Sequence, residues 1–570
     1  MRFRYLLGLP AAALLVAASG TSADVSIVKI AYQNDPAPDT SGGWYTQFLG
    51  GFGIGSPVLD NAGSVAFRAF VGGGSPSNDT ATFAGPPGVV RLWAREGSTL
   101  LGQGGTFGHN SDNGRGFPLI SGSRVAMMGP TNSGVDVIVG ATGAAATYAR
   151  IGGQAATLPA GVQYGSFANL AYGASGQVAF VVSLNGGAYT FRRALYADHL
   201  GPLTPWLIQN NAAPGLSGQS ITTIGGISFN TAGRLACKIG ISSGGAVYTD
   251  HSGALSPVAW TGMSVPGAGT LSTIPEIAVA PSFNSSGRVA FRSFLTSGNA
   301  GHFSDRSGTM QILAFQGMAI PGVAGSQFNS LATTPQPVLN NGGDVAFACE
   351  GWFSGVNYDL VFISRPGGGQ MVAREGLPTP IGGGVNFAAI DYASVRLNNA
   401  GQLAFVSSLA GSGVNSSNDR ALFATESATG PLVAVLREGQ VIDVHGDGSV
   451  LRTVGAFEFS IPNDTRHDPW SGIASGAGAF NDFGTLAFQI NFTDGTQGVF
   501  AATVAPAPTC DPDVNGDGAV NSFDIACQEM AVNGDFSCYT QGSADFNQDG
   551  AENGFDVEAV EQVVNGAPCP

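Results

Sequence analysis

Short apolar strands recur along the chain, and each one directly follows a polar turn. The clearest form reads Asn, two residues, Gly, two residues, Ala and Phe, as in the segment from Asn284 to Phe291. Successive copies begin 53 to 60 residues apart, apart from a last interval of 83 residues. Eight units of similar length indicate an internal repeat. With one degraded copy included, the starting positions are Asp60, Ile120, Gly173, Asn230, Asn284, Asn340, Asn398 and Asn481.

The repeated phrase predicts a tight turn that leads into a buried strand. An Asn or Asp at the first position can accept hydrogen bonds from its own turn, and the Gly can adopt the positive φ that the turn requires. The residues that follow, such as Val345, Ala346 and Phe347, place apolar side chains on both faces of a strand. That pattern is typical of a strand covered on both sides by other sheets.

A second phrase falls between these copies: a short apolar strand, a polar turn and often a Pro-Gly pair. One example is Ile312 to Gly317. With the apolar runs that flank each turn, a unit holds about four strands. Four strands repeated eight times predict an all-β fold, a repeat β-propeller of about eight four-stranded blades over residues 24–505. An open β-solenoid and a pair of smaller propellers are the competing architectures.

The two ends of the repeat region complement each other. Val25 to Pro38 resemble the second phrase with no first phrase before them, whereas Gly484 to Val504 carry a first phrase with no second phrase after them. We therefore expect an N-terminal strand to complete the last blade and close the ring.

Over most of residues 24–505, these repeats resemble bacterial tandem repeat NxxGxxAF-containing proteins with a choice of anchor. The resemblance implies export and anchoring. It does not imply a reaction.

The first residues predict export from the cytoplasm. Arg2 and Arg4 precede an apolar run, Leu6 to Ala18, that is too short to span a bilayer. Small residues then offer a cleavage site before Asp24. We expect residues 1–23 to be a signal peptide and the mature chain to be secreted or held at the cell surface, with no transmembrane span.

Composition and charge narrow the possible partners. The chain has 86 Gly in 570 residues and only 11% charged residues, which is typical of turn-rich β-structure. Its formal net charge is −16, but twelve acidic residues and no Lys or Arg lie between Cys510 and Pro570. The rest of the chain is nearly neutral. Neither part has the basic surface that nucleic acid binding requires.

After a Pro/Ala linker at residues 506–509, the segment 510–570 contains a duplicated loop whose copies are 32 residues apart. Each copy has oxygen-bearing residues at the ligand positions of a calcium loop and Gly at position 6. The sequence therefore predicts two calcium ions, bound by positions 1, 3, 5, 7 and 12, of which position 7 contributes its carbonyl. These residues are Asp513, Asn515, Asp517, Ala519 and Asp524 in the first loop, and Asp545, Asn547, Asp549, Ala551 and Asp556 in the second.

A helix pattern follows each loop, over Asp524 to Val532 and Asp556 to Val564, and none precedes it. With Asp at position 12, residues 510–570 resemble type I dockerins and not ordinary EF-hands. The resemblance implies a cohesin-like or cell-surface protein as the partner. The residues that would contact a cohesin, at positions 10 and 11, are Ser522-Phe523 and Gly554-Phe555, where hydroxyl residues are usual.

Four of the six Cys lie in this small segment, where disulfides would stabilise an exported domain. Cys237 replaces a motif Phe and Cys349 follows Phe347 on the same strand face, so both are expected to be buried thiols. Three connectivities of the other four are possible, and we favour Cys510 with Cys569 and Cys527 with Cys538.

We identify no catalytic residues from the sequence. The six His are scattered through different repeats, with no two at a metal-ligand spacing. The long last interval implies an insertion between Gly439 and Asn481, which we interpret as a solvated excursion. Its polar and aromatic residues include Asp443, His445, Asp447, Arg466, His467, Asp468 and Trp470.

Three functions fit this organisation. The first is a non-catalytic binding or structural propeller attached through the calcium module, with a glycan or a protein bound at the propeller face. The second is an accessory component of extracellular polysaccharide catabolism, brought to a cohesin scaffold. The third is a propeller hydrolase or lyase, which acidic and His side chains gathered at the central channel would favour.

Overall fold

In the computed structural model, the chain has two compact units, one within Val25–Pro506 and one within residues 507–570. The predicted signal peptide and linker lie outside the described residues. The structure describes residues 25–48, 57–75, 77–108, 118–275, 279–331, 336–459, 478–504, 512–517, 520–540, 543–546 and 551–565.

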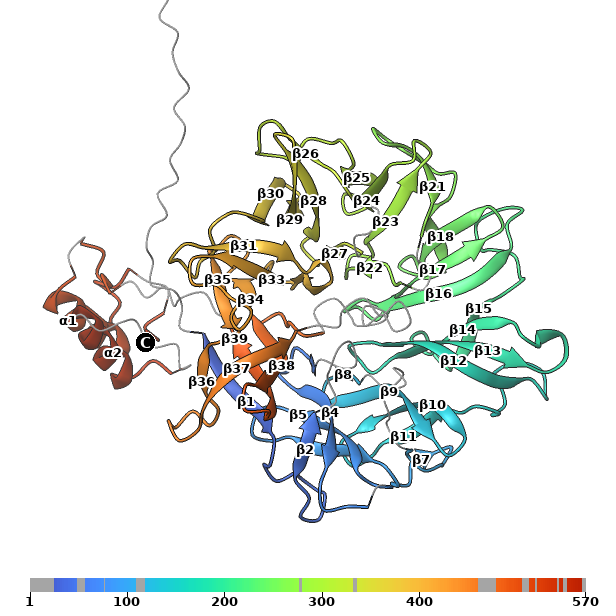
Figure 1. Cartoon of the computed structure of the whole chain (residues 1–570), viewed down its shortest axis with the longest axis horizontal. Coiled ribbons are helices and arrows are strands. Elements are labelled where there is room, and N and C mark those ends of the chain that lie inside the picture. Colours follow the sequence, from blue (N-terminus) through green and yellow to red (C-terminus); the bar gives the residue numbers. More distant parts are fainter. Residues whose placement is uncertain are drawn as a thin grey trace, which may run out of the picture. The chain divides into compact units, whose positions relative to one another are not determined.

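Eight sheets surround a common centre in the larger unit, and each sheet is one blade of a β-propeller (Figure 1). The blades follow one another in chain order. Blade 1 contains β2 (Tyr45–Phe48), β3 (Val58–Leu59), β4 (Val65–Val71), β5 (Thr80–Gly85) and β6 (Arg91–Arg95). Blade 2 contains β7 (Leu101–Gly102), β8 (Leu119–Ser121), β9 (Arg124–Thr131), β10 (Gly134–Ala141) and β11 (Ala146–Ala149). Blade 3 contains β12 (Gln163–Tyr172), β13 (Val178–Asn185), β14 (Arg193–Ala197) and β15 (Thr204–Ile208). Blade 4 contains β16 (Ile221–Phe229), β17 (Leu235–Ile241), β18 (Gly244–Thr249) and β19 (Ser256–Trp260).

The second half of the ring repeats this plan. Blade 5 contains β20 (Ser264–Val265), β21 (Gly269–Thr273), β22 (Ser282–Phe283), β23 (Val289–Leu295), β24 (Ala300–Ser304) and β25 (Gln311–Phe315). Blade 6 contains β26 (Ser326–Phe328), β27 (Val338–Leu339), β28 (Val345–Phe353), β29 (Val356–Arg365) and β30 (Gly368–Arg374). Blade 7 contains β31 (Val385–Ile390), β32 (Arg396–Leu397), β33 (Leu403–Gly411), β34 (Arg420–Thr425) and β35 (Leu432–Arg437). Blade 8 contains β36 (Val441–Asp443), β37 (Leu451–Glu458), β38 (Thr485–Phe492), β39 (Gln497–Thr503) and β1 (Ser26–Tyr32).

This arrangement confirms the predicted all-β, eight-bladed fold. The sheets have four to six strands and not uniformly four. In blades 1, 5, 6 and 7 two strands pair with the same neighbour, whereas blades 2 and 8 have five strands in series. In blade 7, for example, β31 and β32 both pair with β33.

Ring closure is also confirmed. β1 pairs antiparallel with β39, from Ser26 opposite Thr503 to Tyr32 opposite Gly498. The N-terminal strand therefore completes the blade that the C-terminal repeat begins, as the complementary ends of the repeat region predict.

The motif turns have the predicted geometry. In blade 5, the Asn284 side chain accepts a hydrogen bond from the Arg288 main-chain N–H at 2.9 Å, and Gly287 has a φ of 76°. The equivalent Gly residues also have positive φ, and they are Gly63, Gly176, Gly233, Gly343, Gly401 and Gly484.

The same Asn residues link neighbouring blades, which the sequence analysis did not predict. Each side-chain amide donates to the main-chain carbonyl of the motif residue in the next blade, as Asn284 does to Asn340 at 3.1 Å. The series crosses the seam of the ring, where Asn481 donates to Asp60 at 3.2 Å. Buried polar groups need such partners, so the donors form a regular interblade series: Asn230, Asn284, Asn340, Asn398 and Asn481.

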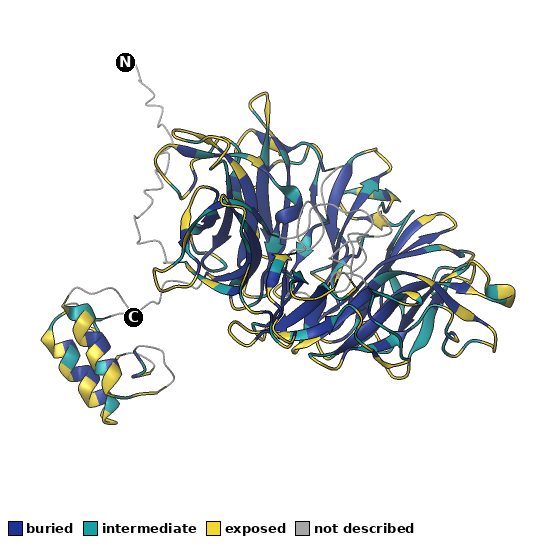
Figure 2. Ribbon diagram, turned by 60° about the horizontal axis from the view of Figure 1, so that its bottom comes forward, coloured by how far each residue is buried: buried dark blue, intermediate teal, exposed yellow. Residues whose placement is uncertain are grey.

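The hydrophobic core lies between adjacent blades, where buried strands face one another (Figure 2). One cluster combines Val361 of blade 6 with Phe387, Phe405 and Phe423 of blade 7. The Phe405 and Phe423 rings are stacked with centroids 5.7 Å apart. Cys237 and Cys349 are buried free thiols, as predicted.

Phe405→Ala is expected to lower the free energy of unfolding by about 3 to 5 kcal/mol, because it leaves a cavity among buried rings. Phe405 is 0% exposed. Denaturant unfolding would measure the loss. Phe483 is 70% exposed and is the matched control, since Phe483→Ala should cost less than about 0.5 kcal/mol. A loss below about 1 kcal/mol for Phe405→Ala would contradict its assignment to the core.

The predicted insertion between Gly439 and Asn481 is only partly an excursion. Its first half forms β36 and β37, which pair as a regular hairpin of blade 8. The extra residues follow Phe459, and residues 460–477, with Arg466, His467, Asp468 and Trp470, lie outside the described residues. In the hairpin, Asp443 and Asp447 accept hydrogen bonds from main-chain N–H groups of their own turn.

The smaller unit contains two helices, α1 (Ser522–Val532) and α2 (Gly554–Val564). Both end where the sequence predicts and begin two residues earlier, because the side chains of Asn521 and Asn553 cap them. A disulfide joins Cys527 to Cys538, as favoured. The other favoured pair, Cys510 with Cys569, lies outside the described residues. The unit has its own core, formed by Val514, Cys527, Ala531, Tyr539, Ala544, Phe546, Ala559 and Val560.

Candidate calcium module and propeller groove

In the first predicted calcium loop, side-chain oxygens of two predicted ligands lie close to one main-chain N–H. The N–H of Asp517 lies 3.1 Å from Asp513 Oδ1 and 2.9 Å from Asn515 Oδ1. Gly516 adopts a φ of 71° in this turn. Three predicted ligands therefore belong to one compact turn.

The last ligand position of each loop is a buried carboxylate at a helix N-terminus. Asp524 and Asp556 are both 0% exposed. Each belongs to a capping box, in which its carboxylate accepts the N–H of the capping Asn, at 2.8 Å in α1 and 2.7 Å in α2. The sequence placed both Asp at position 12 without predicting that they also cap the helices.

Charge in the module favours a bound cation. Residues 510–570 contain no Lys, Arg or His, so no basic side chain of the module can offset its two buried carboxylates. The capping hydrogen bonds offset part of the cost of burying these charges, and no side chain of the module supplies a positive charge. A divalent cation held by hard oxygens would supply the missing positive charge.

The described residues show only part of the predicted ligand sets. Ala519, Asn547 and Asp549 lie outside them. Within the described residues, no group of three or more His, Cys, Asp or Glu is placed to hold a metal ion. Those four residue types leave out the amide oxygen of Asn515, in the first predicted ligand set. They also leave out the main-chain carbonyl of Ala551, in the second set. The residues present therefore fit calcium by chemistry, and their ligation remains a prediction.

Glu552, at position 8 of the second loop, has a structural role that the sequence did not reveal. Its Oε1 accepts hydrogen bonds from the Ser543 hydroxyl at 2.8 Å and from the Ala544 N–H at 3.1 Å. It therefore joins position 8 of the second loop to the residues directly before Asp545.

Two aromatic side chains stand out from the surface of the module. Phe523 is 72% exposed and Phe555 is 67% exposed, and they occupy equivalent positions at the start of α1 and α2. Burial of a large apolar side chain in a partner contributes about 2 kcal/mol. The duplicated loops thus present the same apolar group twice.

The motif turns that begin with Asn or Asp also bond to one another from blade to blade. The N–H of Asn341 donates to Asn399, that of Asn399 to Asp482, and that of Asp482 to Asn61, each at 2.8 to 3.0 Å. In the seven clear copies, this second turn position contains one carboxylate and no His. An acidic and His-rich channel mouth, which would favour an enzyme, is not formed by these turns.

Two buried His are part of the propeller core. His199 Nε2 lies 2.5 Å from Asp250 Oδ2, and both side chains are 0% exposed. This pair joins blade 3 to blade 4, and no pattern in the sequence predicts it. Burial, reinforced by Arg292, lowers the pKa of His302 to about 3. Neither His reaches solvent, so both are structural.

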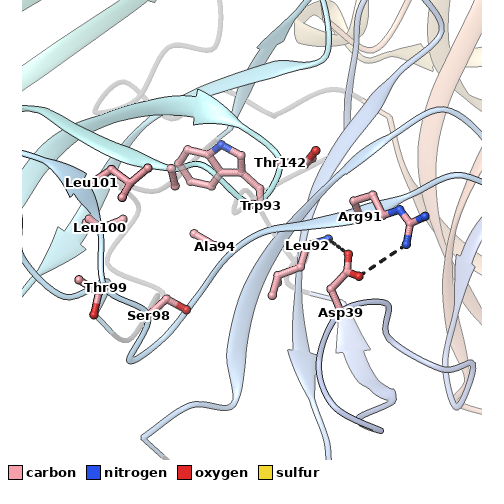
Figure 3. Close-up of a pocket in the computed structure, with 12 residues that line it drawn as sticks. Asp39, Arg91, Leu92, Trp93, Ala94, Ser98, Thr99, Leu100, Leu101 and Thr142 are labelled. Carbon is pink, nitrogen blue, oxygen red and sulfur yellow. Dashed lines mark hydrogen bonds and ion pairs between the residues drawn. The ribbon is translucent and has the colours of Figure 1, made fainter.

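A groove lies on the outer side of the junction between blades 1 and 2, with a cavity volume of about 550 Å³. Its lining has an apolar side with Leu100 and Leu101, and a charged side where Arg91 and Asp39 lie 3.5 Å apart (Figure 3). Trp93, at the centre, donates from Nε1 to the Gly140 carbonyl at 2.9 Å. Nothing in the sequence predicted this groove, because its walls come from two different blades.

Comparison with protein families assigns the propeller to a family. A model described as a family of unknown function, DUF7453, matches residues 59–510. The chain belongs to the DUF7453 family. The match covers all eight motif turns of the DUF7453 propeller. The similarity of the repeats to choice-of-anchor tandem repeat proteins remains a resemblance in sequence, because the matching models name other families.

A second model, the dockerin type I domain, matches residues 511–565. This confirms the predicted C-terminal dockerin type. Type I dockerins bind calcium and cohesin domains. None of the helices in the described part of the chain is long and apolar enough to cross a bilayer.

Solved structures share low similarity with this DUF7453 chain, and a search of curated proteins found no match. A puromycin-hydrolyzing peptidase of Mycobacterium tuberculosis has 10% identity and a TM-score of 0.36. The match covers 82% of this chain and 62% of the peptidase, so the chain spans less than two thirds of that protein. The β-propeller domain of the Trilobed protease from Pyrococcus furiosus has 8% identity and a TM-score of 0.33, over 68% of this chain and all of that domain. A PL25 ulvan lyase has 10% identity and a TM-score of 0.33, over 81% of this chain and 96% of the lyase.

Proposed function

We propose that the chain is a secreted or cell-surface binding propeller, non-catalytic, which is attached to a cohesin-like protein through its calcium-dependent C-terminal module. The observation that carries the proposal is the dockerin type I match over residues 511–565, directly after the propeller. Dockerin modules occur in extracellular and cell-surface proteins, which agrees with the predicted signal peptide at residues 1–23.

The structure supports attachment through the two helix starts. Phe523 and Phe555 take the places that contact a cohesin in the dockerin resemblance, and both are exposed. Calcium in the neighbouring loops would fix these helix starts through Asp524 and Asp556, which both cap a helix and occupy position 12. Binding of the partner is therefore expected to depend on calcium.

Binding, and not catalysis, is proposed for the propeller because the polar side chains of its motif turns and its buried His199–Asp250 pair have structural roles. The Asn amides bond neighbouring blades, and the His199–Asp250 pair is buried between blades 3 and 4. A rigid ring of this kind suits the display of a binding surface on its loops.

The test is binding of the purified mature chain to surface protein from the cells that secrete it, and to isolated cohesin domains. Binding should be retained in calcium and lost in EGTA. The double variant Phe523→Ser, Phe555→Ser should bind at least tenfold more weakly, because both apolar contacts are lost. Phe536→Ser, at a residue 44% exposed in the same module, is the matched control. Equal binding by residues 25–506 alone would contradict attachment through the module.

A further inference from the structure

The groove between blades 1 and 2 has the size of a binding site and walls that are held in place. Its volume of about 550 Å³ falls within the usual range for small-ligand sites. One wall is β6, the outer strand of blade 1. The other is the turn between β10 and β11 of blade 2, where Thr142 and Gly143 lie.

Hydrogen bonds between the blades hold these walls in place. Trp93 donates to the carbonyl of Gly140 at 2.9 Å, and the Gly143 N–H donates to the carbonyl of Leu92 at 3.1 Å. The groove is therefore formed before any ligand arrives, which lowers the entropy cost of binding.

Blade 2 departs from the repeat at this place. The connection from blade 1 adds β7 to the blade as a parallel strand, with Leu101 opposite Ala146 of β11. The other strand pairs of the described propeller are antiparallel. This added strand places Leu101, 58% exposed, on the groove. A local departure from a regular repeat is often the mark of a functional site.

The lining suits an uncharged ligand with both hydroxyl and C–H surfaces. Arg91 and Asp39 side chains remain 59% and 46% exposed, so the guanidinium can donate and the carboxylate can accept beside each other. Their charges cancel, which disfavours a strongly charged ligand. Leu92 and Leu101 provide apolar contact, and the hydroxyl of Thr99 adds a further polar group.

Pairing of a peptide strand with β6 is disfavoured at the centre of the groove. Both main-chain groups of Leu92 are already bonded, its N–H to Asp39 at 3.3 Å and its carbonyl to Gly143 at 3.1 Å. A sugar needs no main-chain ladder. It can lay its C–H face on Leu92 and Leu101 while neighbouring hydroxyls bond Arg91 and Asp39.

We infer that this groove binds a neutral oligosaccharide. The inference rests on the proposed function in that it gives the binding propeller its ligand class. The groove does not involve the C-terminal module. Its test therefore uses the mature chain in calcium, and substitutions in the groove should leave attachment through the module unchanged.

Calorimetric titration with cellohexaose, xylohexaose and mannohexaose tests the groove. At least one of them should bind with one site per chain. Arg91→Gln and Leu101→Ser should each weaken that binding at least tenfold. Arg452→Gln and Leu451→Ser are matched controls, because Arg452 pairs with Asp494 at 2.8 Å and Leu451 is 57% exposed on blade 8. Both controls should change the affinity less than twofold.

Each other outcome would overturn the inference. It fails if none of the three hexaoses binds, or if binding is the same in Arg91→Gln and Leu101→Ser as in the parent chain. It also fails if a random peptide library yields peptides that bind in the groove and the hexaoses do not compete with them. Calcium-dependent attachment, measured on the same Arg91→Gln and Leu101→Ser variants, should stay intact.

If the parent chain itself showed no calcium-dependent attachment, that result would count against the proposed function and not against the groove.

Discussion

Removal of β1 is expected to destabilise the whole propeller and not a single blade. Deletion of residues 25–32 from the mature chain strips the outer strand from blade 8 and exposes buried side chains of the seam. Ile30 and Tyr32 are 8% and 7% exposed, and burial of two such side chains contributes about 4 kcal/mol. Scanning calorimetry should show the main transition of the propeller at a clearly lower temperature.

The seam explains why the effect should spread. Blade 8 is joined to blade 1 through the Asn481 amide, which donates to Asp60, and through Gln497, whose side chain accepts the Phe48 N–H at 3.0 Å. Loss of β1 also leaves β39 as an unprotected edge, which favours association between molecules.

Val28→Ser is the control for this deletion. Val28 lies on β1 but is 46% exposed, so the substitution keeps the strand and its main-chain pairing with Ala501. Its transition temperature should match that of the parent chain. An unchanged transition after deletion of residues 25–32 would contradict a ring closed by β1.

The repeat made the fold predictable, because a turn such as Asn284 to Gly287 has the same local requirement in every blade. Asn at the first position and Gly at the fourth are determined by bonds within the turn. The second contact of the same Asn, from its amide to Asn340, depends on how far the next blade is rotated. No local sequence pattern encodes that rotation, so the hydrogen bonds from the motif Asn amides to the next blade were not predicted.

Features built from two blades were missed for the same reason. His199 and Asp250 are 51 residues apart and meet only because blades 3 and 4 pack together. The groove likewise depends on the pairing of Leu101 with Ala146. The insertion was bounded too widely, because spacing alone counts extra residues without locating them. It does not show that Val441 to Glu458 still form a regular hairpin.

In the module, the loop pattern predicted more than the helix pattern did. Spacing from Asp513 to Asp524 identified the ligand positions, whereas Ser522 and Phe523 were left outside the helix. The capping side chain of Asn521 extends α1 to Ser522, and this effect depends on its orientation. The disulfide between Cys527 and Cys538 was predictable from their closeness in sequence within a small, Cys-rich domain.

The isolated module, residues 507–570, is expected to bind two calcium ions and to lose helix when they are removed. It forms its own compact unit with its own core. Its buried carboxylates, Asp524 and Asp556, have no Lys, Arg or His in the module to offset them, so the ions stabilise the folded state. Calorimetric titration should give two sites. Circular dichroism in EGTA, with the disulfide reduced, should show most of the helix signal lost.

Single substitutions separate specific binding from general attraction to an acidic segment. Asp513→Ala and Asp545→Ala should each remove one site and leave the other, because each loop binds through its own oxygens. Asp535→Ala removes the same charge from the segment between the loops, where the Ser537 hydroxyl and N–H lower the pKa of the Asp535 carboxyl. It should keep both sites. If all three variants lost binding equally, or if binding faded in 0.5 M NaCl, the ions would be held by net charge and not by the two loops.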